Sequence, residues 1–151
     1  IGLDTGDTAL DEYFRYKKEF VIINGHSNVG KTTTAINLCA ALGETRRKVL
    51  LIDLDPQGNA TTGSGVEKES LELSICDVLL GDCSSRDAIV KPEHIQYHVL
   101  PGNADLTAAE VQLMSENGRE RRLAEALSSI ADTLFHLENG ELRILHNQHN
   151  K

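Results

Sequence analysis

Two short, unbroken apolar runs, separated by an amphipathic segment, constrain the fold of this chain more than any other feature. Residues 20–23 (FVII) and 49–52 (VLLI) are aliphatic, β-branched and aromatic, which is typical of strands buried on both faces of a sheet. Residues 31–42 between them predict a helix, with one apolar side formed by Ala35, Leu38, Cys39 and Leu42. This order predicts a right-handed βαβ unit with parallel strands, the start of a doubly wound α/β sheet.

The flanking residues predict further elements of the same fold class. Gly43 is expected to end the first helix as its C-terminal cap. Residues 55–65 are rich in turn-forming residues and predict a loop without secondary structure. Beyond it we expect a short helix at 75–80, a strand at 97–100 and two more helices. In the second of these, Leu123, Leu127, Ile130 and Leu134 keep helical spacing.

Composition describes an acidic single domain. The 151 residues include 15 Lys+Arg and 23 Asp+Glu, a formal net charge of −8, which argues against broad attraction to nucleic acid or anionic membranes. No apolar run reaches the roughly 18 residues of a membrane span, and the acidic start is unlike a secretory signal. The three cysteines form no paired framework, so we expect reduced thiols in a cytoplasmic protein.

Residues 25–32 (GHSNVGKT) match the phosphate-binding pattern G-x-x-x-x-G-K-[ST]. Glycines allow a tight turn whose backbone N–H groups point at a phosphate, and the following helix adds its positive N-terminal end. The lysine places a charge between β- and γ-phosphate, and the threonine hydroxyl is suited to Mg²⁺. We therefore predict a nucleotide site with Thr32 as metal ligand, formed by Gly25, His26, Ser27, Asn28, Val29, Gly30, Lys31, Thr32 and Thr33.

Two carboxylates follow the second predicted strand. Asp53 and Asp55 alternate around Leu54 and therefore point to the same side of the strand. Ligands of open parallel sheets bind beyond the carboxyl ends of the strands, so one of them is expected near the phosphate loop. Spacing alone does not decide between the two.

Residues 30–38 (GKTTTAINL) and 48–61 (KVLLIDLDPQGNAT) resemble the ParA/Soj family of partition ATPases, and similarity extends over roughly residues 20–130. The resemblance implies ATP and Mg²⁺ as cofactors, an ATP-bound sandwich homodimer and non-specific DNA binding. It also implies a centromere-binding partner of ParB type that stimulates hydrolysis. At these matching positions the resemblance implies that Lys31 contacts phosphate, that Thr32 binds Mg²⁺ and that Asp55 is the water-activating carboxylate.

The chain departs from the family pattern at three places. His26, Ser27 and Asn28 stand where the family has a lysine and two glycines, and that lysine reaches the partner subunit's nucleotide. After Asp132 no third central strand with a Walker B carboxylate is identifiable, and Asn139-Gly140 predicts a β-hairpin instead. The chain also stops near where the family's second half would begin, as expected for a truncated or frameshifted gene product.

These observations predict an incomplete P-loop NTPase sheet in three segments. Residues 1–18 form a peripheral extension, 19–131 the N-terminal portion of a P-loop ATPase, and 132–151 a divergent tail with the hairpin. Two functions stay open. One is a ParA-like ATPase of chromosome or plasmid partition, and the other is a truncated or degenerate nucleotide-binding remnant or regulator without hydrolysis. The isolated chain is expected to be nearly inactive.

Overall fold

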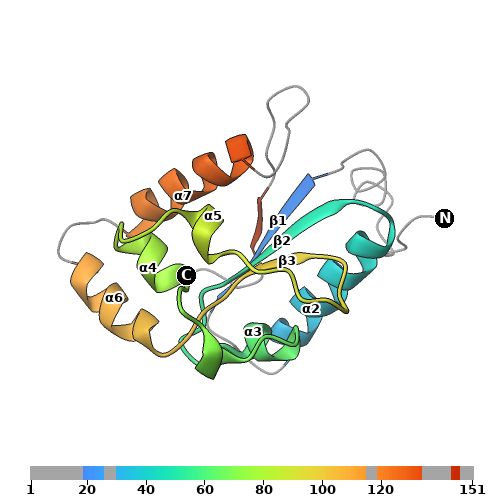
Figure 1. The fold of residues 1–151 in the computed structure, drawn as a ribbon, viewed down its shortest axis with the longest axis horizontal. Coiled ribbons are helices and arrows are strands. Elements are labelled where there is room, and N and C mark those ends of the chain that lie inside the picture. The colour runs from blue at the N-terminus through green and yellow to red at the C-terminus, as the bar shows by residue number, and fades with distance from the viewer. Residues whose placement is uncertain (1–18, 26–29, 115–118, 134–143, 147–151) are drawn as a thin grey trace.

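The computed structural model describes residues 19–25, 30–114, 119–133 and 144–146, so the predicted N-terminal extension lies outside it. Each of the first three strands is followed along the chain by one or more helices (Figure 1). They are β1 (Glu19–Asn24), α2 (Lys31–Glu44), β2 (Lys48–Asp53), α3 (Asn59–Gly63), the 3₁₀ helix η1 (Lys68–Ser70), α4 (Ile75–Leu79), α5 (Ser85–Ala88), β3 (His98–Leu100), α6 (Asp105–Met114), α7 (Arg119–Thr133) and β4 (Ile144–His146).

The described strands form one parallel sheet in the order β3-β2-β1-β4. β1 and β2 run side by side from Glu19 opposite Lys48 to Asn24 opposite Asp53. The predicted parallel βαβ unit is therefore confirmed. The register also brings two polar residues, Asn24 and Asp53, together at the carboxyl edge of the sheet.

Helices cover both faces of the sheet (Figure 1). The alternation of strand side chains sends Phe20 and Ile22 toward α2, while Val21 and Ile23 face the layer of α4, α6 and α7. This two-sided burial explains why the strands read as unbroken apolar runs. The doubly wound α/β fold class is confirmed. Within the described ranges, no helix combines the length and apolar character that crossing a bilayer requires.

The prediction of a loop without secondary structure at 55–65 is wrong, because α3 lies within it. Gly58 starts this helix in the left-handed region, with φ 64°. The first turn is then held by carboxylates outside the helix: Asp55 accepts a hydrogen bond from the Asn59 N–H, and Asp53 from the Thr61 N–H. Local periodicity does not reveal this capping, because the two carboxylates belong to the end of β2 and to the loop that follows it.

Gly43 does not end α2 as predicted, since the helix continues to Glu44 and Thr45 is its C-terminal cap. The left-handed residue beyond the helix is Arg46, with φ 66°. Gly43 is buried, and a Cβ there would overlap the backbone oxygen of Gln96. This glycine is needed for close packing rather than for the helix cap.

α4, β3, α6 and α7 lie where the sequence predicts a short helix, a strand and two further helices, whereas η1 and α5 were not predicted. α4 ends before Gly81, which has φ 82°, and β3 ends before Pro101. The hairpin turn predicted at Asn139-Gly140 lies outside the described residues. Residues 144–146 were not predicted to join the main sheet, yet they form β4 and pair in parallel with β1, Val21 opposite Ile144.

Replacing Gly43 by alanine tests the close-packing interpretation. In an ordinary helix interior, glycine to alanine stabilises by about 1 kcal/mol. Here we expect Gly43→Ala to lower the free energy of unfolding by about 1–3 kcal/mol, because the new methyl group overlaps backbone. Urea unfolding measures the change, with Asn37→Ala at an exposed position of the same helix as control. A stabilised Gly43→Ala protein would contradict the interpretation.

Candidate functional site

Both ends of the predicted phosphate loop lie at the carboxyl edge of the sheet, one after β1 and the other before α2. Gly25 follows the last residue of β1, Gly30 precedes α2, and Lys31 and Thr32 begin that helix. Thr33 is exposed in the same turn. The remaining candidates lie outside the described residues: His26, Ser27, Asn28 and Val29. Both ends of the loop are thus placed at the edge where open α/β sheets bind ligands.

Gly30 supplies the backbone conformation that starts α2. It has φ 97° and ψ −31°, in a region where L side chains are strained. Its carbonyl accepts hydrogen bonds from the N–H (2.9 Å) and the hydroxyl (2.7 Å) of Thr34. The first turn of α2 carries no acidic side chain, so no carboxylate of that turn neutralises the positive end of the helix dipole. This helix start is suited to an anion.

Asp53 is the central acceptor of the site. Its fully buried carboxylate accepts hydrogen bonds from the Thr61 N–H (2.8 Å) and hydroxyl (2.7 Å), the Asp55 N–H (3.2 Å) and the Asn24 amide (3.3 Å). Burial raises the pKa of Asp53, while these hydrogen bonds act in the opposite direction. All these groups are hydrogen-bond donors, which suits a carboxylate, because a carboxylate only accepts hydrogen bonds.

Asn24 links this carboxylate to the phosphate loop. Its side-chain nitrogen lies 3.3 Å from Asp53 Oδ1 and 3.5 Å from the Thr32 hydroxyl oxygen. The first turn of α2 and the end of β2 are thus joined through one side chain of β1.

Asp55 is held differently, on its own loop. Its carboxylate oxygens accept hydrogen bonds from the N–H groups of Gln57 (3.1 Å) and Asn59 (3.3 Å), and the side chain is 2% exposed. The structure therefore distinguishes the two aspartates that spacing left open. Asp53 joins neighbouring strands and α3, whereas Asp55 shapes the loop that follows β2.

Sequence reasoning missed Asn24 and Thr61 as site residues. A polar residue closing a buried apolar run is a weak signal that favours Asn24, since a buried amide needs hydrogen-bond partners. Thr61 carries no such local signal. Its hydroxyl donates to Asp53 and accepts from the Gly102 N–H (2.9 Å), a pairing that depends on β3 lying beside β2.

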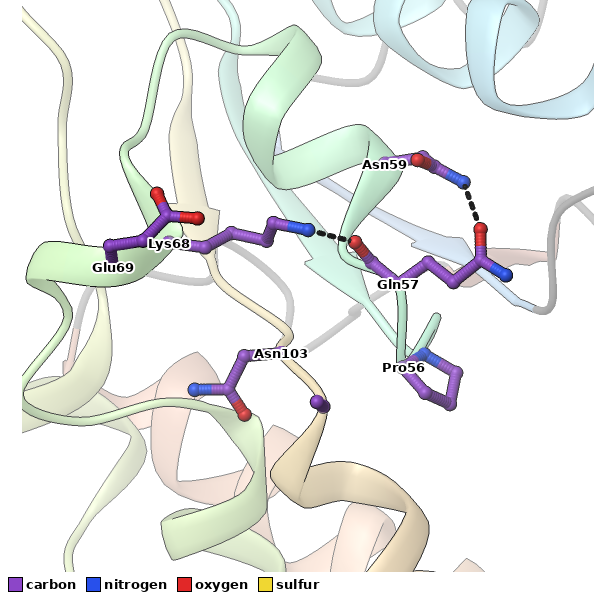
Figure 2. A pocket seen from close by; sticks show the side chains of 7 residues that line it. Pro56, Gln57, Asn59, Lys68, Glu69 and Asn103 are labelled. Carbon is purple, nitrogen blue, oxygen red and sulfur yellow. Dashed lines mark hydrogen bonds between the residues drawn. The ribbon is translucent and has the colours of Figure 1, made fainter.

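A cavity of about 540 Å³ is lined by Pro56, Gln57 and Asn59 of the segment that follows β2 (Figure 2). One wall is the loop after β2, where the Gln57 carbonyl accepts a hydrogen bond from the Lys68 ammonium group. Asn103, from the loop after β3, forms the opposite wall. Both walls therefore connect to Asp53, one through the Asp55 N–H and the other through Thr61 and Gly102.

Residues 17–135 match the sequence model of a protein family described as an AAA domain. The chain belongs to this family. An uncharacterized protein of Pseudomonas putida strain KT2440 is 55% identical over 115 residues, which cover 76% of this chain and 44% of that protein. The chromosome partitioning protein ParA of Caulobacter vibrioides is 45% identical over 109 residues, 72% of this chain and 41% of the relative. The resemblance to the ParA/Soj group is confirmed.

Solved structures of other proteins share this fold. The crystal structure of cobyrinic acid a,c-diamide synthase from Mycobacterium smegmatis with bound ATP analogue and magnesium superposes with a TM-score of 0.69 at 34% identity. The match covers 87% of this chain and 52% of that one. The chain therefore spans about half the length, or less, of these matched proteins.

Replacing Thr61 tests the importance of the Asp53 hydrogen bonds. Thr61→Val keeps the shape but removes the hydroxyl, leaving the buried Gly102 N–H without its acceptor. We expect a loss of about 1–3 kcal/mol in the free energy of unfolding. Thr61→Ser retains the hydroxyl and should lose less than about 1 kcal/mol. Equal losses in urea unfolding of the two variants would show that packing, not hydrogen bonding, fixes Thr61.

Proposed function

We propose that this chain contains the nucleotide-binding portion of a ParA-type ATPase and binds ATP or ADP with Mg²⁺. The position of residues 25–32, joining a buried parallel strand to the start of α2, carries the proposal. Backbone N–H groups of the loop would hold the β-phosphate, and Lys31 would neutralise charge between β- and γ-phosphate. The relative crystallised with an ATP analogue and magnesium supports this assignment.

The oxygen groups at the strand ends fit Mg²⁺, which prefers hard oxygen ligands and retains several waters. The Thr32 hydroxyl lies in the first turn of α2 beside the end of β1, and Asp55 follows β2 on the same edge of the sheet. We assign Thr32 as the direct ligand. When bound, the ion would neutralise phosphate charge.

Asp55 and Lys31 are the proposed catalytic residues. Two lone pairs of the Asp55 carboxylate are used by Gln57 and Asn59, which leaves acceptor capacity for a water molecule. The loop geometry thus supports the water-orienting role that the family resemblance assigns to Asp55.

The wider role we propose is chromosome or plasmid partition in the cytoplasm, as the ParA relative's name suggests. Such a role would involve a ParB-type partner, non-specific DNA and a nucleotide-dependent homodimer.

The departure at His26 favours a second function, nucleotide binding without efficient hydrolysis. A histidine is shorter than the family's lysine and mostly neutral at pH 7, so it does not replace the trans-acting charge.

The nucleotide site is tested by Lys31→Ala. We expect the substitution to weaken binding of Mg²⁺–ADP by at least about tenfold, equivalent to about 1.4 kcal/mol, because the charge facing the phosphates is lost. Titration calorimetry measures the two affinities. Lys48→Ala is the matched control, since Lys48 is an exposed lysine at the opposite edge of the sheet. Equal affinities of the wild type and Lys31→Ala would refute the phosphate-loop assignment.

Turnover separates the two proposed functions. Groups that act as a unit lose activity far more than additively when one is missing, so His26 predicts phosphate release near background. Asp55→Ala should then change the rate little. A steady-state assay on the purified chain, with Lys31→Ala as the background reference, measures this. Robust turnover that Asp55→Ala abolishes would favour the ATPase over the non-hydrolysing protein.

A further inference from the structure

Asn24 is a polar side chain in a position surrounded by apolar strand residues. It is fully buried at the last position of β1, after the buried Ile22 and Ile23. Its backbone carbonyl accepts a hydrogen bond from the Leu54 N–H (2.7 Å), which fastens the ends of β1 and β2 together. Because a buried amide is costly without hydrogen-bond partners, its partners indicate its role.

The amide nitrogen of Asn24 faces two acceptors from different elements. Asp53 Oδ1 on β2 lies 3.3 Å away, and the Thr32 hydroxyl oxygen on α2 lies 3.5 Å away. A carboxylate only accepts, so the amide must present its NH₂ group to Asp53, and the second N–H is then available to Thr32. The chemistry of Asp53 therefore fixes which way the Asn24 amide is turned.

This orientation constrains the Thr32 hydroxyl. A hydroxyl has two lone pairs and one proton. When Asn24 donates to one lone pair, the other lone pair and the proton are directed elsewhere, which limits rotation of the hydroxyl. An oxygen with one lone pair engaged and the other free is suited to binding a cation.

The anchor of this arrangement is rigid. Asp53 is held on its far side by the N–H and hydroxyl of Thr61, at 2.8 and 2.7 Å. Movement of the Asn24 amide away from Thr32 would therefore break a hydrogen bond to a buried carboxylate, which is costly.

We infer that Asn24 is a positioning residue of the phosphate site, which orients the Thr32 hydroxyl for Mg²⁺ by bridging it to Asp53. The inference rests on the proposed nucleotide function and assigns a role to a residue that the phosphate-binding motif does not include. Asn24 acts through Thr32 and contributes selectively to the step in which Mg²⁺ strengthens nucleotide binding.

The test is the ratio of ADP affinities with saturating Mg²⁺ and with a chelator, measured by calorimetry. Asn24→Ala should reduce this Mg²⁺ enhancement by about three- to tenfold, the range expected for one lost hydrogen bond, and leave Mg²⁺-free affinity unchanged within about twofold. Ser64→Ala is the matched control, because it removes a buried hydrogen bond, to the Tyr97 hydroxyl, that involves none of Asn24, Asp53 and Thr32. It should keep the wild-type enhancement.

A thermodynamic cycle with Thr32→Ala separates positioning from a general structural effect. If Asn24 acts through the hydroxyl, adding Asn24→Ala to Thr32→Ala should change the enhancement no further. An unchanged enhancement in Asn24→Ala, an equal loss in Ser64→Ala, or full additivity in the double variant would each overturn the inference. A wild-type chain that binds no nucleotide would refute the proposed function itself and the inference with it.

A second measurement needs no variant and applies if Asn24→Ala does not fold. The side-chain amide NMR signals of Asn24, assigned in the wild-type protein, should shift when Mg²⁺–ADP is added and stay in place with ADP alone. Signals that are insensitive to Mg²⁺ would overturn the inference.

Discussion

A buried carboxylate, that of Asp53, organises the carboxyl edge of this sheet. It accepts hydrogen bonds from the end of β1, from the first turn of α3 and from the loop that follows its own strand. An unpaired buried carboxylate would cost several kcal/mol, so each donor is required once the charge is in place. Because the donors come from separate segments, the charge also fixes where those segments lie. Its raised pKa reflects the same burial.

The hydrogen bonds connect the first turn of α2 to the second half of the described chain. From the Thr32 hydroxyl they lead through Asn24 and Asp53 to Thr61, and from there to the N–H of Gly102 after β3. A Cβ at Gly102 would overlap the Asp53 carbonyl, so only glycine permits this close approach. The cavity lined by Gln57 and Asn103 lies between the two loops that these contacts hold in place. The first turn of α2 and the walls of the cavity are therefore connected by one set of hydrogen bonds.

The close glycine contacts show why local patterns misplace some residues. Glycine is common at helix caps, which led to the prediction for Gly43. The position requires glycine for another reason, the close contact with Gln96, a residue far away in sequence. The segment containing α3 matches the composition of a loop, yet Asp53 and Asp55 cap its first turn. The Gly43 contact comes from a segment far away in sequence, and the α3 hydrogen bonds come from side chains that precede the helix, so the periodicity of the helix residues reports neither.

The sequence by itself determined the parallel βαβ unit and the family. Apolar runs, helical spacing and a glycine-lysine-threonine pattern are local features that depend on backbone geometry and burial. Only the tertiary structure decided the roles of Asn24, Asp53 and Thr61, and the place of β4 beside β1. These depend on which strands become neighbours. A buried charge selects its partners by distance in space, and spacing along the chain does not encode that distance.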